Sequence, residues 1–111
     1  MSESSRRAED VNISAQEAQA RQQAGAIMLD VREPDEWQEG HIPGARHVPL
    51  GELEMRLAEL DPTQEIVAVC HSGYRSGIAA QALRATGFAR VWNLDGGMVA
   101  WERAHLPVTP G

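Results

Sequence analysis

Cys70, the only cysteine of the chain, begins the segment Cys-His-Ser-Gly-Tyr-Arg-Ser, which ends at Ser76. The apolar residues 66–69 before it predict a strand, and residues 76–86 after it predict a helix. Where a strand turns into a helix, backbone N–H groups converge and the helix dipole is positive. That setting lowers the pKa of a thiol and stabilises an anion on the sulfur. The segment therefore predicts a reactive thiolate that can act as a nucleophile.

Charged residues are unevenly distributed around this cysteine. The formal net charge is −6, yet residues 66–94 contain no Asp or Glu and do contain Arg75, Arg84 and Arg90. The pattern indicates either a local field that attracts anions or core strands in which charges are rare. Because the chain is acidic and its arginines are scattered, it is not expected to bind nucleic acid.

Length and composition narrow the class of protein. A chain of 111 residues is expected to form one domain. No apolar stretch approaches the roughly 20 residues that cross a bilayer, and residues 1–10 lack the pattern of a signal peptide. With a single cysteine there is no disulfide framework and no C-x-x-C redox pair. We therefore expect a cytoplasmic protein with no membrane partner.

The domain is predicted to span residues 11–108, with tails at 1–10 and 109–111. Within it, helices and strands alternate, and these elements must position Cys70. A capping box from Ser14 to Glu17 predicts the first helix. Strands are expected at 26–31, 46–48, 66–69 and 90–94, and helices at 15–23, 34–39, 50–60, 76–86 and 98–105. This alternation predicts a mostly parallel sheet with helices on both faces. Ligands bind such sheets at the carboxyl ends of the strands, where Asp30 and Cys70 fall.

Two of these helices carry specific expectations about their buried faces. Leucines at helical spacing predict that residues 50–60 form an amphipathic helix, which Asp61 and Pro62 end. The residues expected on the buried face of the 76–86 helix are Ile78, Ala79, Ala82 and Leu83.

Four segments, in order, resemble the signatures of the rhodanese family of sulfurtransferases. They are Leu29-Asp-Val-Arg-Glu33, Glu39-Gly-His-Ile-Pro-Gly-Ala45, Cys70-His-Ser-Gly-Tyr-Arg-Ser76, and Leu94-Asp-Gly-Gly97 with Trp101. Each segment is weak alone, but four in order are specific, and they cover roughly residues 10 to 108. The resemblance implies an α/β fold: a single rhodanese-like domain with a central, mostly parallel five-stranded sheet flanked by helices on both faces.

The resemblance also implies a reaction. Cys70 would take a sulfane sulfur from thiosulfate or a persulfide donor, become a persulfide, and pass the sulfur to cyanide or a thiol. A thiol on a partner protein is an alternative acceptor. This chemistry needs no metal and no cofactor. His41 and His47 lack further ligands at suitable spacing, so neither is expected to bind a metal.

The loop residues His71, Ser72, Gly73, Tyr74 and Arg75 are expected to surround the sulfur, mainly through backbone N–H groups. Gly73 permits the tight turn. His71 tunes the thiol, touches the substrate or faces solvent, and Tyr74 lies at the rim of the site or packs on the surface. Ser72 could add a hydroxyl donor or cap the next helix.

The remaining site residues have alternative roles. Arg75 is expected to hold the oxyanion of the donor, or else to pair with Asp30 or another carboxylate. Ser76 is expected to cap the helix rather than donate to the sulfur. Asp30 and Arg32 are expected to brace the loop from the neighbouring strand, as the resemblance implies. The acidic residues Glu33, Asp35, Glu36 and Glu39 are interpreted as a solvated face.

Two other functions use the same kind of domain. A phosphatase or arsenate reductase has a longer loop, Cys-x5-Arg, whereas this chain has Cys70-x4-Arg75. The shorter loop fits one sulfur atom better than a tetrahedral oxyanion. A non-catalytic rhodanese-like interaction module usually lacks the cysteine, which is present here. Both comparisons favour a sulfurtransferase.

Overall fold

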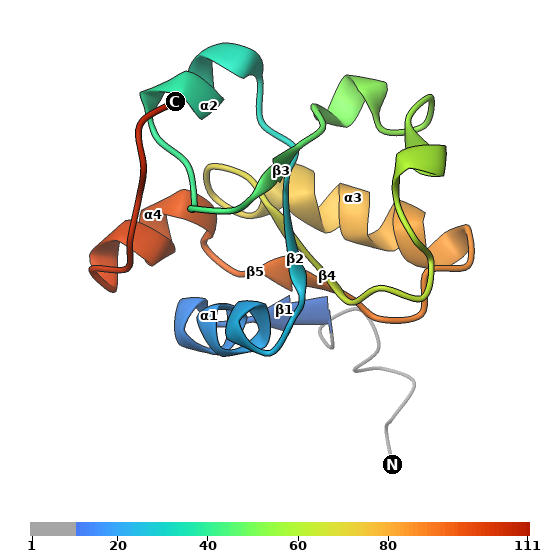
Figure 1. Ribbon diagram of the computed structural model, residues 1–111, viewed down its shortest axis with the longest axis horizontal. Helices are drawn as coiled ribbons and strands as arrows, with labels where there is room; N and C mark the ends of the chain where they lie inside the picture. The colour runs from blue at the N-terminus through green and yellow to red at the C-terminus, as the bar shows by residue number, and fades with distance from the viewer. Residues whose placement is uncertain (1–10) are drawn as a thin grey trace.

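Five short segments of the chain, of which the inner three are mainly apolar, form a sheet in which every neighbouring pair is parallel (Figure 1). The computed structural model describes residues 11–111, so the predicted tail at 1–10 lies outside the described residues. The strand order is β1-β5-β4-β2-β3. The strands are β1 (Asn12–Ile13), β2 (Ile27–Asp30), β3 (Arg46–His47), β4 (Ile66–Val69) and β5 (Val91–Leu94). Strand β4, which directly precedes Cys70, is therefore the middle strand.

Helices cover both faces of this sheet, as Figure 1 shows. They are α1 (Ala15–Gln23), α2 (Pro34–Glu39), α3 (Tyr74–Ala85) and α4 (Gly97–Arg103), with 3-10 turns η3 (Leu50–Glu52) and η4 (Leu57–Glu59). Helices α1 and α4 share a core on one face, whereas α3 and the 3-10 turns pack on the other. The predicted α/β class, with a parallel sheet between two helical layers, is confirmed.

The side chains of β4 alternate between the two cores, as a buried strand requires. Ile66 and Ala68 face the core under α3, and Val67 and Val69 face the core under α1 and α4. Cys70 continues this alternation and belongs to the α3 core. Its side chain therefore points toward the start of the helix that follows it.

Several local predictions are confirmed at atomic detail. The hydroxyl oxygen of Ser14 accepts the backbone N–H of Glu17 at 3.1 Å, which completes the N-terminal cap of α1. Pro34 occupies the first turn of α2, where its missing N–H costs nothing. The predicted bounds of β2, β4, β5 and α4 agree with the structure to within one or two residues.

The predicted helix at 50–60 is wrong. Two 3-10 turns occupy this segment instead, separated by irregular turns. Gly51 lies inside the predicted helix and disfavours it, while the leucines reach the core without one. Leu53 and Leu60 are buried, and Leu50 packs against them.

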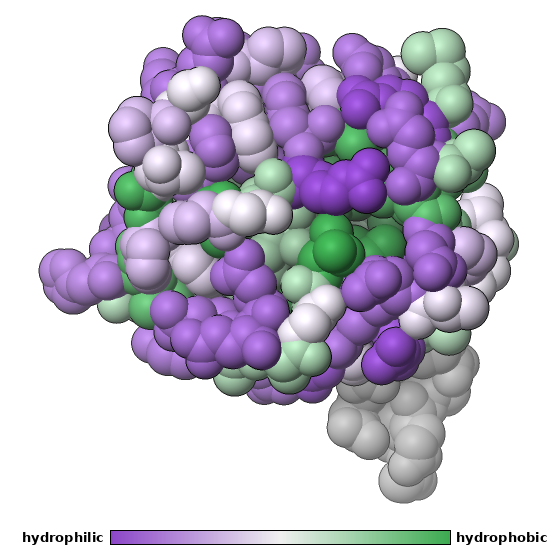
Figure 2. Space-filling model, viewed as in Figure 1, coloured by the Kyte–Doolittle hydropathy of each residue, from purple (hydrophilic) through white to green (hydrophobic). Residues whose placement is uncertain are grey.

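These turns leave an apolar groove beside α3. The groove has a volume of about 330 Å³ and is lined by Leu50, Leu57 and Leu83 among others. Figure 2 shows apolar surface hollowed between the 3-10 turns and α3. The helical spacing of the leucines thus reflects a shared buried face rather than a continuous helix.

Helix α3 begins at Tyr74, two residues earlier than predicted, and its buried face agrees with the prediction only at Ala79 and Leu83. Its buried residues are Ser76, Ala79, Ala80 and Leu83, whereas Ile78 is 45% exposed. Ala82 is also exposed. Because the helix begins at Tyr74, Ser76 lies in its first turn and is buried. Ser76 therefore does not cap the helix; Gly73 holds the N-cap position, in the left-handed region with φ of 102°.

The last residues of the chain lie against α2. Thr109 forms an antiparallel bridge with His41, and the backbone N–H of Gly111 donates to the carbonyl of Gln38 at 3.1 Å. The indole N–H of Trp101 donates to the carbonyl of Pro107 at 2.7 Å.

Within residues 11–111, none of the helices has the length and apolar character that a membrane span would need.

Candidate active site: a cysteine in a cradle of hydrogen-bond donors

Cys70 follows the last residue of β4 and is only 1% exposed. The backbone N–H of Gly73 donates to its sulfur at 3.1 Å, and the hydroxyl of Ser76 lies 3.3 Å from it. The loop from Cys70 to Gly73 thus wraps around its own first residue. The sulfur is therefore shielded from water and lies close to hydrogen-bonding groups of the protein instead.

Burial by itself raises the pKa of the Cys70 thiol, because a thiolate loses its hydration. The Ser76 hydroxyl and the backbone N–H groups of Ser76, Gly73 and Ser72 act in the opposite direction, since they stabilise the anion. Together they outweigh burial, and the pKa of Cys70 is lowered from its ordinary value. The cradle therefore favours a negatively charged sulfur.

The outer side of the loop is held by the first turn of α4. The backbone N–H groups of Met98 and Val99 donate to the carbonyls of Cys70 and His71, at 2.9 and 3.1 Å. A Cβ at Gly97 would lie 2.4 Å from the Cys70 carbonyl oxygen, which is closer than atoms can approach. Glycine is therefore required at position 97, and the loop carbonyls point toward α4 while the N–H groups remain available to the sulfur.

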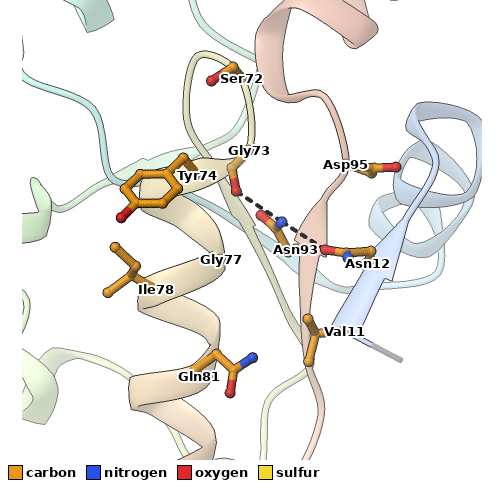
Figure 3. A pocket seen from close by; sticks show the side chains of 10 residues that line it. All are labelled: Val11, Asn12, Ser72, Gly73, Tyr74, Gly77, Ile78, Gln81, Asn93 and Asp95. Atoms are coloured by element: carbon orange, nitrogen blue, oxygen red, sulfur yellow. Dashed lines mark hydrogen bonds between the residues drawn. The ribbon is translucent and has the colours of Figure 1, made fainter. Parts of the chain in front are cut away.

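Asn93 is a site residue that sequence reasoning missed. It is buried in β5, and its side-chain oxygen is a second acceptor for the Ser76 hydroxyl, whose single proton can be donated either to this oxygen or to the Cys70 sulfur. Its amide nitrogen donates to the Gly73 carbonyl at 3.1 Å and to the side chain of Asn12 at 2.9 Å (Figure 3). Because the Gly73 carbonyl can only accept, the orientation of the amide is fixed. The available signal was one polar residue inside an otherwise apolar strand.

An open groove of about 510 Å³ borders the loop on the side of α3 and β1 (Figure 3). Tyr74 and Ile78 line it and are 76% and 45% exposed. Ser72 also lines the groove, whereas His71 is exposed outside it. The position of Tyr74 is compatible with the predicted rim role, which stays a prediction.

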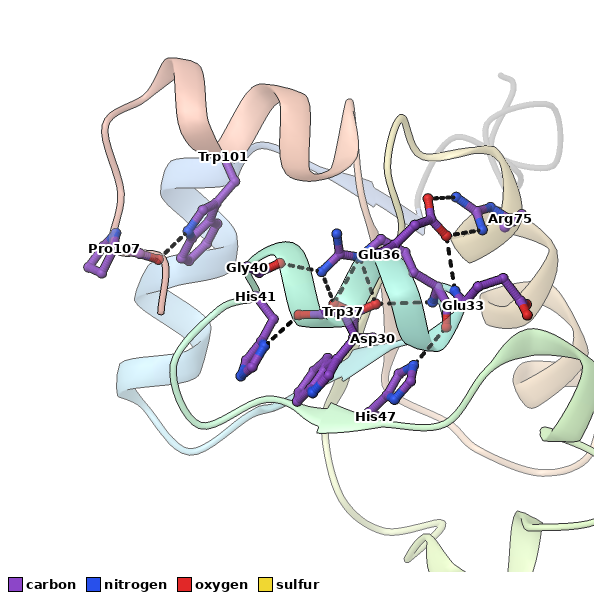
Figure 4. Close-up of polar contacts among 11 residues, drawn as sticks. Asp30, Glu33, Glu36, Trp37, Gly40, His41, His47, Arg75, Trp101 and Pro107 are labelled. Carbon is purple, nitrogen blue, oxygen red and sulfur yellow. Dashed lines mark hydrogen bonds and ion pairs between the residues drawn. The ribbon is translucent and has the colours of Figure 1, made fainter. Parts of the chain in front are cut away.

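The side chain of Arg75 extends from the loop toward α2. Its two terminal nitrogens donate to the two carboxylate oxygens of Glu36 at 2.8 and 2.9 Å (Figure 4). The carboxylate partner that the sequence left open is thus Glu36, and not Asp30. Contact between Arg75 and a substrate stays a prediction.

Glu36 does not belong to a solvated face, because its side chain is only 28% exposed. The Arg75 hydrogen bonds are the main cause that lowers the pKa of Glu36, to about 2, against the opposing effect of burial. Glu36 also accepts the backbone N–H of Glu33 at 2.9 Å, as the third helical residue of a capping box. The pair joins α2 to the first turn of α3.

Asp30 and Arg32 form a second ion pair, at the end of the neighbouring strand β2. Asp30 is 0% exposed, and the Arg32 guanidinium donates to it at 2.8 to 3.1 Å. The same guanidinium donates to the carbonyl of Gly40 at 2.7 Å. Asp30 is paired in register with Val69, the residue before Cys70. The pair lies where the predicted brace would be, and it ties the two ends of α2 to the sheet.

His41, in the signature segment at 39–45, and His47, just after it, stack on one tryptophan and bond backbone carbonyls. The rings of His41 and His47 stack on Trp37, with centroids 3.5 and 4.7 Å away. His41 bonds the carbonyl of Trp37 at 3.0 Å, and His47 bonds that of Arg32 at 2.7 Å. Among residues 11–111, no three His, Cys, Asp or Glu side chains converge on a point that a metal ion could occupy.

Comparison with known proteins agrees with this geometry. The family model of the rhodanese-like domain matches residues 14–104. The chain belongs to the rhodanese-like domain family. The rhodanese-related protein of Thermoplasma volcanium has a solved structure with a TM-score of 0.83, 28% identity, and coverage of 88% of this chain and 96% of that chain.

Curated rhodanese relatives are similar in sequence as well. The thiosulfate sulfurtransferase GlpE of Stutzerimonas stutzeri is 34% identical over 93 residues, which are 84% of this chain and 85% of that protein. YrkF of Bacillus subtilis is 49% identical over 74 residues, which are 67% of this chain. The chain spans 40% to 60% of the length of YrkF and two further curated relatives.

Proposed function

We propose that this rhodanese domain is a sulfurtransferase in which Cys70 carries a sulfane sulfur between a donor and a thiophilic acceptor. The observation that supports it most is a sulfur that is 1% exposed, accepts the Gly73 N–H, and lies within reach of the Ser76 hydroxyl. A buried sulfur surrounded by dipoles is suited to a charge that forms and disappears during each turnover.

The first step is a displacement at the outer sulfur of the donor. With thiosulfate, the Cys70 thiolate forms the new S–S bond while the bond to the sulfonate sulfur breaks, and sulfite leaves with the electron pair. With a persulfide R–S–SH, the thiolate R–S⁻ leaves instead. Either way Cys70 becomes a persulfide, and the charge stays near the donors of the loop.

The second step returns the enzyme to its starting state. A thiolate or cyanide attacks the outer sulfur of the persulfide, and the Cys70 thiolate leaves as the S–S bond breaks. No second cysteine exists to divert the persulfide into an internal disulfide. Because Cys70 is almost fully buried, donors and acceptors with a single protruding sulfur or carbon atom fit best.

The acceptor that we propose is a thiol, either on a small molecule or on a partner protein. The groove beside the loop, with Tyr74 and Ile78 exposed along it, leaves room for a molecule larger than cyanide. A thiol that must stay reduced between turnovers suits the cytoplasm, which is the compartment that we propose.

The arginine of the loop argues against a phosphatase. A phosphatase needs that arginine directed at its bound oxyanion, whereas both terminal nitrogens of Arg75 bind Glu36. The Cys-x4-Arg spacing agrees. The lowered pKa of Cys70 likewise argues against a module without chemistry.

Mass spectrometry of the intact protein tests the proposal. After treatment with thiosulfate or with cysteine persulfide, Cys70 should gain about 32 Da, and cyanide or a thiol should remove the addition. The Cys70→Ser variant is the control and should gain nothing. If the wild-type protein gains no sulfur from either donor, but hydrolyses an aryl phosphate, the sulfurtransferase proposal is wrong.

A further inference from the structure

The charge of Arg75 is balanced before any substrate arrives. Its guanidinium makes two parallel hydrogen bonds with Glu36, at 2.8 and 2.9 Å, in the geometry that gives the strongest carboxylate pairs. The two side chains are 31% and 28% exposed, so solvent screens the pair only in part. The pair as a whole carries no net charge.

The other guanidinium near the site is also committed. Arg32 binds Asp30 and the Gly40 carbonyl, and only 6% of its side chain is exposed. The chain contains no lysine. Within residues 11–111, both arginines that flank the cysteine loop are therefore paired with a carboxylate.

The two classes of sulfane donor differ in charge. Thiosulfate is a dianion, so its attack by the Cys70 thiolate brings three negative charges together. A protonated alkyl persulfide brings only the charge of the thiolate. Hydrogen-bond donors such as Gly73 N–H stabilise a charge on the sulfur, but the sulfonate of thiosulfate would need a cation beyond them.

We propose that Glu36 is a specificity-determining residue, which disfavours dianionic donors such as thiosulfate relative to persulfide donors by neutralising Arg75. The inference rests on the proposed function and names its donor class. Glu36 acts through Arg75 and does not touch the sulfur. The effect should fall on the KM for thiosulfate, because the missing cation binds the donor.

Glu36→Gln is the test, and the structure explains why the variant should fold. The glutamine oxygen can still accept the backbone N–H of Glu33, since glutamine serves in a capping box as well as glutamate does. Asp35→Asn is the matched control. Asp35 is an exposed residue of the same first turn, so the same charge is removed without freeing Arg75.

The kinetic experiment compares the two donors in both variants. In Glu36→Gln, kcat/KM for thiosulfate should rise about fivefold, mainly through KM, while kcat/KM for cysteine persulfide changes less than about twofold. Asp35→Asn should leave the ratio of the two donors unchanged. Equal changes for both donors in Glu36→Gln would overturn the inference, because they would mean that Glu36 only shapes the loop.

Alkylation of Cys70 provides a readout that does not depend on sulfur transfer. Iodoacetate carries a negative charge and iodoacetamide does not, so the ratio of their rates reports the electrostatic field at the sulfur. The iodoacetate to iodoacetamide ratio should rise about fivefold in Glu36→Gln and stay constant in Asp35→Asn. An unchanged ratio in Glu36→Gln would refute the role of Glu36, even in a protein that transfers no sulfur.

A double variant with Arg75→Gln tests whether Glu36 acts through Arg75. If Glu36 acts through Arg75, Glu36→Gln should have no effect on either ratio in the Arg75→Gln background. A persisting effect there would place the influence of Glu36 elsewhere. Failure of the wild-type protein to transfer sulfur from any donor would instead count against the proposed function alone.

Discussion

Two neighbouring strands of the sheet end in buried groups that carry or can carry a negative charge, and they stabilise it in different ways. Asp30, at the end of β2, is 0% exposed and faces a complete guanidinium from Arg32. Cys70, directly after β4, is 1% exposed and has the N–H of Gly73 and the O–H of Ser76. One charge has a counter-ion, and the other has dipoles.

The proposed function accounts for this difference. A buried carboxylate with a dedicated cation is held permanently, because removing either partner leaves an uncompensated charge. A sulfur that alternates between thiolate and persulfide would be trapped by so strong a partner. Dipoles of fixed orientation stabilise the anion without binding it in one chemical state. Under the proposed function, a permanent ion pair and a reactive centre therefore lie on neighbouring strands.

Replacing the reactive atom should have the largest effect. Cys70→Ser should lower sulfur transfer by at least about a thousandfold, because the alkoxide needed for attack is not formed at neutral pH. Circular dichroism and the urea midpoint should stay near those of the wild type. Retention of transfer activity by the serine variant would refute a covalent mechanism at this position.

Breaking the permanent pair should instead affect stability. Asp30→Ala leaves the Arg32 guanidinium buried without its partner, which should cost about 3–5 kcal/mol in the free energy of unfolding. Urea denaturation measures this loss. The double variant Asp30→Leu with Arg32→Met should be less destabilised than the single variant. A double variant that is less stable than Asp30→Ala would contradict the contrast between the two strand ends.

Removing one donor from the cradle tests how far dipoles replace a counter-ion. Ser76→Ala removes a hydrogen bond to the anion but leaves the burial, so the pKa of Cys70 should rise. The pH profile of iodoacetamide alkylation should therefore move to higher pH. Transfer activity at neutral pH should fall about tenfold and recover partly in alkaline buffer.

The shift of the alkylation profile in Ser76→Ala shows whether the Ser76 hydroxyl stabilises the thiolate. If the alkylation profile stays in place, Ser76 does not stabilise the thiolate, and the backbone N–H groups carry the effect alone. Thr is the conservative replacement, since it keeps the hydroxyl; Ser76→Thr should retain more of the low-pH reactivity than Ser76→Ala does.

The smallest effect is expected from a loop side chain. His71 contributes its carbonyl to α4, whereas its imidazole is exposed. His71→Ala should therefore change kcat/KM by less than about twofold. A loss of more than tenfold with a small thiol as acceptor would show that the imidazole takes part in the reaction.

The local parts of this fold could be predicted because their signals are local. Apolar runs, the Ser14 capping box and Pro34 located strands and helices, and the Cys70 segment identified the reactive group. Three features depend on contacts between distant residues. They are the burial of Ser76, the pairing of Arg75 with Glu36 and the network around Asn93.

The errors share one physical origin. Leucines from 50 to 60 had helical spacing, but packing against α3 was satisfied by two short turns. Ser76 had the residue type of a cap, but the left-handed Gly73 placed the helix start two residues earlier. Residue type restricts what a side chain can do, and the neighbours that the fold supplies decide which of those roles it takes.

Helix α4 holds the cysteine loop through the carbonyls of Cys70 and His71, and the sulfur is served mainly from the main chain. Positions 71, 72 and 74 can therefore be randomised in a library without dismantling the catalytic machinery. The glycines at 73, 96 and 97 must be kept for backbone reasons. New preferences for a sulfur recipient could then be selected at the mouth of the site, independently of the chemistry inside it.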